Sequence, residues 1–208
     1  MTAPRYRFDR GKPFYPLVMN YFCQLIGMKE LIIRGVVGPR RIDEMLAIAV
    51  AREPRSEPEL LRKQLGILIG PLQLRSERIN GTIDAPIDEI VHDLIANHPV
   101  LLPHFISAAG AVLVLAHEIS KHRPWHNQGP IWEFLRHCRN AVAHGGTLHF
   151  ARTEPSRPAE WRSLVLTAEL HGTPLHKKDG SGRGMLSPGD PILLLWDIEQ
   201  MHPAMIAE

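Results

Sequence analysis

Arg139, Asn140 and His144 are the three residues of this sequence whose types and spacing best suit a chemical reaction. Asn140 and His144 are four residues apart, so in a helix their side chains share one face, and Arg139 lies to one side of them. Gly145 and Gly146 follow at once and favour the end of a helix there. The spacing therefore predicts a guanidinium, an amide and an imidazole together at one helix end.

Such a set suits chemistry on a phosphate group, because all three side chains can donate hydrogen bonds to phosphate oxygens. The C-terminal end of the helix dipole favours a protonated imidazole, which helps His144 donate a proton near neutral pH. These groups can cleave RNA without a metal. A general base takes the proton of the 2′-hydroxyl, Arg139 stabilises the charge on the phosphorane, and the products carry a 2′,3′-cyclic phosphate and a 5′-hydroxyl.

The motif supplies one histidine in each chain, whereas the reaction uses both a general base and a general acid. Two helix ends that meet across a two-fold axis would bring two copies of His144 and Arg139 into one cleft, so the sequence predicts a homodimer with a composite site. A structural interpretation stays open beside it, in which His144 caps the helix and Arg139 forms a salt bridge.

Two other groups of reactive residues fit chemistry less well. His117 and His122 resemble the histidines of a zinc-protease helix. They are five residues apart, however, which places them about 140° apart around a helix and prevents both from reaching one metal ion. Cys138 lies among apolar helical residues, where we expect it to fill space rather than act as a nucleophile. We therefore expect no metal and no cofactor at the site.

The helix that carries the motif is predicted to span residues 130–144, because Pro130 suits a first helical position. The preceding segment, 100–122, is the longest apolar stretch and predicts a central core helix. A short polar loop joins the two, so we expect them to pack antiparallel, with the motif against the start of the core helix. Apolar periodicity predicts further helices at 13–28, with Gly27 as its stop, and at 40–50, 57–74 and 84–97.

The pattern changes after Gly146. Strand-forming residues at 161–170, a turn at 171–173 and a short strand at 174–176 predict a small β-hairpin. Residues 177–188 predict a loop, and because no helix begins directly after it, it does not match a phosphate-binding loop.

A last helix is predicted to begin with Asp190 as its N-cap and Pro191 at the first helical position. Its buried side is expected to include Leu194, Leu195, Ile198 and Met201. The fold class is thus mainly α, a helical bundle with a small C-terminal β-hairpin and a final helix. We expect a single domain of residues 1–208, in which 13–146 form the bundle with the motif and 147–208 form the hairpin and terminal helix.

The composition is that of an ordinary globular protein. With 208 residues, 44% hydrophobic and 22% charged, the chain can bury a full core. A net charge of +2 permits contact with nucleic acid without requiring it. The two cysteines define no disulfide framework, no segment has the length of a membrane span, and the N-terminus lacks a signal-peptide core. We therefore expect a cytoplasmic protein with no membrane contact.

The run Arg139-Asn140-Ala141-Val142-Ala143-His144 resembles the motif of the HEPN superfamily. That motif is an Arg, a polar residue that is often Asn, a few variable residues and then a His, at the end of a helix in an α-helical bundle. The sequence matches it without a gap, and residues 85–150 carry the resemblance. The tail, 161–198, is similar to plasmid-borne members that add a β-hairpin and a last helix.

The resemblance implies a metal-independent endoribonuclease that acts as a homodimer in toxin–antitoxin, phage-defence or RNA-processing systems. RNA is then the substrate, and an antitoxin or other regulatory protein is an expected partner. Arg139 would bind the scissile phosphate and stabilise the transition state, His144 would do acid–base work, and Asn140 would orient His144 or the phosphate. Glu118 on the preceding helix is expected to orient Arg139. The alternative is a non-catalytic dimeric module that binds RNA or nucleotides, or has a regulatory role, in which Arg139 and His144 only hold the interface.

Overall fold

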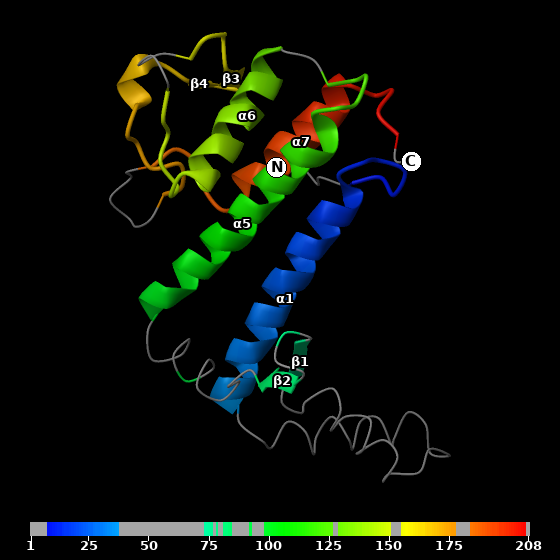
Figure 1. Cartoon of the computed structure of the whole chain (residues 1–208), viewed down its shortest axis with the longest axis vertical. Helices are drawn as coiled ribbons and strands as arrows, with labels where there is room; N and C mark the ends of the chain where they lie inside the picture. The colour runs from blue at the N-terminus through cyan, green and yellow to red at the C-terminus, as the bar shows by residue number, and fades with distance from the viewer. Residues whose placement is uncertain are drawn as a thin grey trace, which may run out of the picture. The chain divides into compact units, whose positions relative to one another are not determined.

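The structure is a computed structural model of the chain. It describes residues 8–37, 73–76, 78, 81–84, 92, 98–126, 129–150, 155–177 and 184–206. These residues are mainly helical, as the sequence predicts (Figure 1). Contacts define two compact units: unit 1 is Met1–Leu25 with Leu102–Glu208, and unit 2 is Ile26–Leu101.

Four long helices account for most of the described chain. They are α1 (Tyr15–Val37), α5 (His98–Ser120), α6 (Pro130–Ala143) and α7 (Asp190–Met201). The predicted bounds of α5, α6 and α7 agree with the structure to within about two residues. In the described part of the chain, no helix combines the length and the apolar character that crossing a membrane requires.

Helix α1 is longer than the sequence predicts, because it continues through Gly27 to Val37. A glycine inside a helix costs only about 1 kcal/mol relative to alanine. Val18 and Tyr21 of the same helix are buried in the core, and their packing stabilises the helix that contains Gly27. The expected stop at Gly27 was therefore wrong, and residues 29–36 belong to the same helix.

The core of unit 1 lies among all four helices and the segments after α6. Helix α6 contributes its largest apolar side chains, and the other elements cover them. The fully buried side chains include Val18, Leu113, Ala116, Trp132, Phe134, Leu135, Cys138, Leu148, Leu175, Leu186, Leu194, Leu195 and Ile198. Residues after 146 therefore share one core with the motif helix.

Helix α7 departs from the prediction at both ends. Gly189 is its N-cap residue, and the Asp190 side chain accepts a hydrogen bond from the backbone N–H of Ser187 at 2.7 Å. Asp190 thus stabilises the turn before the helix rather than its first N–H groups. Met201 is 62% exposed, so its predicted burial was wrong. It is the last residue of the helix.

Helices α5 and α6 pack antiparallel, as predicted, and two contacts show it. Arg139 of α6 reaches Glu118 near the end of α5, with 3.0 Å between Nη2 and Oε1. Val142, later in α6, lies against Gly110, where an added Cβ would come within 3.0 Å of the valine Cγ1. The motif therefore ends beside the middle of α5 and not beside its start. Helix α6 has 14 residues and α5 has 23, so α6 ends about halfway along its neighbour.

The C-terminal hairpin is shorter than predicted and lies earlier in the chain. Strands β3 (Glu160–Trp161) and β4 (Leu164–Val165) pair antiparallel, and Ala168–Leu170 form a 3-10 helix, so a strand over 161–170 was wrong. The turn contains Arg162 at a φ of 52°, which is unusual for a non-glycine residue. Its guanidinium binds Asp197 of α7 through two hydrogen bonds of 2.7 and 3.0 Å, which hold the turn against that helix.

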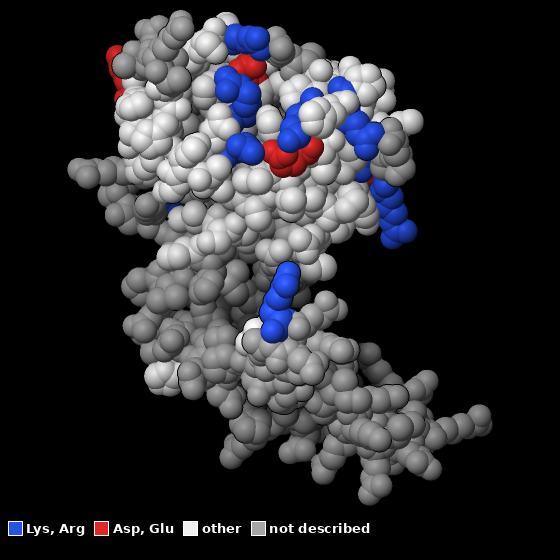
Figure 2. Space-filling model, viewed as in Figure 1, with Lys and Arg blue, Asp and Glu red and all other residues white. Residues whose placement is uncertain are grey.

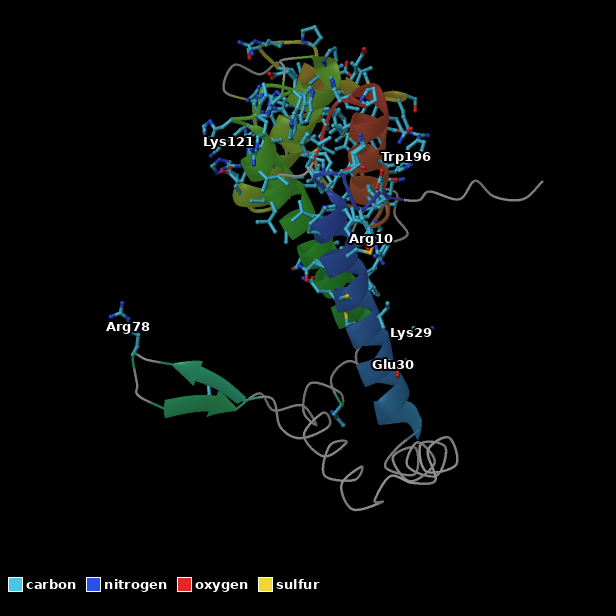
Figure 3. The ribbon with its side chains drawn as sticks, turned by 90° about the vertical axis from the view of Figure 1, so that its right-hand side faces the viewer. Arg10, Lys29, Glu30, Arg78, Lys121 and Trp196 are labelled. Atoms are coloured by element: carbon cyan, nitrogen blue, oxygen red, sulfur yellow. The ribbon has the colours of Figure 1, made fainter. Side chains whose placement is uncertain are left out.

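A second hairpin, β1 (Gln73–Ser76) and β2 (Gly81–Asp84), belongs to unit 2. Its strands pair from Gln73 with Asp84 to Ser76 with Gly81, and Figure 3 labels Arg78 in the turn between them. The predicted helix 57–74 therefore overran into a strand, because residues 73–76 pair with residues 81–84. The predicted helix 40–50, and most of those at 57–74 and 84–97, lie outside the described residues.

Candidate active site

Helix α6 ends at the motif because two glycines follow it. His144 is the C-cap residue, and its backbone N–H donates to the carbonyl oxygens of Asn140 (3.0 Å) and Ala141 (3.2 Å). Gly145 and Gly146 have φ angles of 84° and 82°, in the left-handed region that favours glycine. The glycine pair therefore fixes His144 at the last turn, as predicted from the sequence.

Arg139 is held between two acceptors. Its Nη2 donates to Glu118 Oε1 on α5 at 3.0 Å, and its Nη1 donates to the Asn140 Oδ1 at 3.3 Å. Its Nε is buried and has no hydrogen-bond partner within the described part of the chain. Glu118 thus lies where it can orient Arg139.

Glu118 binds two cations at once. Lys121 on the same helix donates to its Oε2, and Arg139 donates to its Oε1. The hydrogen bonds from Lys121 and Arg139 lower the pKa of this carboxyl to about 2. The carboxylate therefore stays ionised at physiological pH, and the three side chains together carry one net positive charge. Figure 3 shows Lys121 and Trp196 of α7 on opposite sides of the bundle, so the ion pairs lie on the side of α5 away from Trp196.

His117 is a further titratable group beside these ion pairs. Its Nδ1 lies 3.7 Å from Glu118 Oε1, the oxygen that also accepts from Arg139. This nitrogen is buried and makes no hydrogen bond to any described residue. The ring meets that of His126 edge to face, with centroids 5.9 Å apart. Burial lowers the pKa of His117, and the nearby His126 and Arg139 lower it further.

His117 was weighed from the sequence only as a zinc ligand, and its position beside Arg139 was missed. One signal was available: it directly precedes Glu118, which was expected to meet Arg139. In the described chain, no group of three or more histidine, cysteine, aspartate or glutamate side chains could hold a metal ion.

His144 differs from Arg139 and Asn140 in its surroundings. Its side chain is exposed, and it makes no hydrogen bond to the described residues, whereas Arg139 and Asn140 are partly buried. The structure thus brings Arg139, Asn140 and Glu118 into direct contact and leaves the imidazole of His144 open at the helix end. An open imidazole is available to a substrate or to a second chain.

Trp132 anchors the opposite end of α6. Its indole stacks on the ring of His126 with centroids 4.6 Å apart, and its Nε1 donates to His202 Nε2 at 3.0 Å. Since His202 follows α7 directly, this hydrogen bond ties the start of α6 to the end of α7. Cys138 is fully buried, and burial raises the pKa of its thiol, which agrees with the predicted packing role. These contacts fix the helix that presents the motif.

The charged surface of the described residues is mixed. On the face in Figure 2, Lys and Arg side chains gather over the upper part of the molecule beside acidic ones and form no continuous basic stripe. An apolar hollow of about 560 Å³ opens elsewhere in unit 1 and contains none of the motif residues. It is lined by Phe8, Tyr21, Phe22, Leu25, Phe105 and Ile192, among others.

Comparisons with protein-family models, with curated proteins and with solved structures give no match for this chain. The resemblance to the HEPN superfamily therefore rests on the motif residues and on the helices that carry them.

Proposed function

We propose that this protein is a metal-independent endoribonuclease of the HEPN type that acts as a two-fold dimer, in a toxin–antitoxin or defence system. One observation carries the proposal. Arg139 is fixed by Glu118 and Asn140 at the end of α6, while the imidazole of His144 stands exposed one turn further on. A phosphate binder and a proton-transfer group are thus presented together at one helix end.

The ion pair with Glu118 leaves Arg139 able to bind a phosphodiester. Glu118 engages one guanidinium nitrogen and is also neutralised by Lys121. A guanidinium has five N–H donors, so several stay available for phosphate oxygens. One carboxylate between two cations leaves a net positive charge, which favours an anion at this place.

The reaction follows from these groups. Arg139 binds the scissile phosphate and stabilises the charge that develops on it during attack by the 2′-hydroxyl. His144 transfers a proton in the same step, and Asn140 holds the guanidinium in place. Two copies of α6 that meet across a two-fold axis would supply two of each group to one cleft. The products would be a 2′,3′-cyclic phosphate and a 5′-hydroxyl end.

The test is cleavage of structured and unstructured RNA by purified protein in the presence of EDTA. We expect Arg139→Ala and His144→Ala each to lower the rate about 100-fold or more. Arg136→Ala is the matched control. Arg136 also forms a salt bridge, with Glu133, and its side chain is 35% exposed, against 32% for that of Arg139. Cleavage that survives His144→Ala, or that stops with EDTA, would overturn the proposal.

One observation favours a second candidate function, a non-catalytic dimeric module that binds RNA or nucleotides. Arg139 already forms a salt bridge with Glu118, as a purely structural arginine would. This candidate predicts no cleavage of any RNA by the wild-type protein. It also predicts that Arg139→Ala weakens dimerisation, measured by analytical ultracentrifugation, whereas the ribonuclease proposal predicts a loss of turnover in the dimer that remains.

A further inference from the structure

We propose that His117 is a second catalytic residue of this site, the general base that takes the proton from the 2′-hydroxyl of the RNA. The inference rests on the ribonuclease function proposed above. It assigns base and acid to two different histidines, with His144 as the acid. The sequence motif contains one histidine only. Without His117, that histidine would have to act as both base and acid, or two copies of it would have to come from a dimer.

The position of the His117 ring carries the inference. Glu118 Oε1 accepts a hydrogen bond from Arg139 at 3.0 Å and lies 3.7 Å from His117 Nδ1. The imidazole and the guanidinium therefore flank one carboxylate oxygen, although they come from different helices. A phosphodiester bound to Arg139 would lie within one or two side-chain lengths of this ring.

The carboxylate also selects the useful tautomer of His117. Nδ1 is buried and has no hydrogen-bond partner among the described residues, and Glu118 Oε1 lies 3.7 Å from it. A carboxylate beside Nδ1 favours a proton on that nitrogen, which leaves Nε2 as the basic one. The side chain is 13% exposed, and this exposed part does not include Nδ1. The Nδ1 edge of the ring is thus buried beside Glu118, and solvent reaches other atoms of the side chain.

The charges around His117 keep it neutral when the reaction starts. Burial lowers the pKa of this imidazole, the ring of His126 and the guanidinium of Arg139 lower it further, and Glu118 raises it. Lys121 also faces Glu118 and reduces its effect. A neutral imidazole near pH 7 can accept a proton at once, which is what a general base requires.

The step balances without any further reactant. His117 Nε2 takes the proton of the 2′-hydroxyl, and the 2′-oxygen forms a bond to phosphorus. The bond from phosphorus to the 5′-oxygen breaks, and that oxygen takes a proton from the protonated His144. Arg139 stabilises the phosphorane between the two events. No electron is gained or lost, and no water is consumed.

The experiment compares His117→Asn with wild type in the whole chain of 208 residues. The asparagine amide can donate to Glu118 from nearly the place of Nδ1, but it has no basic nitrogen. We expect kcat to fall about 100- to 10,000-fold and the acidic limb of the pH–rate profile to disappear. His122→Ala is the control, because His122 is exposed two residues beyond the end of α5. We expect it to leave rate and profile unchanged.

A second variant separates catalysis from folding. Added imidazole should raise the cleavage rate of His117→Ala at least tenfold, because it can enter the vacated space and act as the base. A structural role would give no such rescue and would let His117→Asn keep its activity. If wild type cleaves RNA and His117→Asn cleaves within threefold of it with the same pH profile, this inference is wrong and the ribonuclease proposal stands. If wild type cleaves no RNA, the proposed function fails and the inference fails with it.

Discussion

Glu199 is a buried carboxyl whose titration should control the stability of unit 1. It lies on α7 with only 3% of its surface exposed, and its Oε1 accepts the backbone N–H of Phe14 at 3.2 Å. Burial raises the pKa of this carboxyl to about 7, against the lowering effects of the Phe14 N–H and of Lys12. A carboxyl whose pKa is higher in the folded state keeps its proton longer when folded. The contribution of Glu199 to stability is therefore greatest below pH 4.5 and is lost as the pH rises toward 7.

The magnitude follows from the two pKa values. A rise from 4.5 to about 7 corresponds to about 3 kcal/mol of unfolding free energy lost above pH 7. Glu199→Gln is neutral at every pH, and its Oε1 can still accept the N–H of Phe14. The variant should match wild type below pH 4.5 and exceed its unfolding free energy by up to about 3 kcal/mol at pH 8. Such a gain is a large part of the 5–15 kcal/mol typical of a domain.

Urea unfolding between pH 4.5 and pH 8, followed by tryptophan fluorescence, measures this difference. All four tryptophans lie in unit 1, as Glu199 does. Only the difference between the two proteins isolates Glu199, because several partly buried histidines with lowered pKa values change stability in the opposite direction: His117, His126, His137 and His176. Glu160→Gln, at an exposed position, is the control. An equal difference between variant and wild type at pH 4.5 and pH 8 would refute the reasoning.

Three further substitutions test individual features. Gly27→Ala should stabilise α1 by roughly 0.5–1 kcal/mol, since an added Cβ meets nothing within 4 Å; slower amide hydrogen exchange in α1 is the measurement, and unchanged exchange would contradict it. Gly184→Ala should destabilise unit 1 by at least about 1–3 kcal/mol, because φ is 110° and the new Cβ would overlap the carbonyl oxygen of His176; an unchanged melting temperature would show that this turn can shift. His144→Ala should change the unfolding free energy by no more than about 0.5 kcal/mol, since the side chain is exposed. A larger loss in urea unfolding would show a structural role that no contact among the described residues explains.

Local chemistry made the motif helix predictable. Proline at its start and two glycines after His144 have strong positional preferences that act within one turn, so the bounds of α6 followed from the sequence. The same local rules failed at Gly27, because one glycine inside a helix costs only about 1 kcal/mol and does not by itself end the helix. They also failed at the C-terminal hairpin, where a turn at Arg162 is held by Asp197, a residue 35 positions away.

The sequence by itself determined that Arg139, Asn140 and His144 lie at the C-terminal end of α6, because Pro130 and the glycine pair set the bounds of that helix. The sequence also led us to expect Glu118 beside Arg139, whereas only the tertiary structure showed that His117 lies there too. The approach of α6 to α5 depends on the close contact at Gly110 and on the lengths of the two helices. That approach places Glu118 and His117 beside Arg139. Contacts between helices arise from packing across distant parts of the chain, and no local preference encodes them.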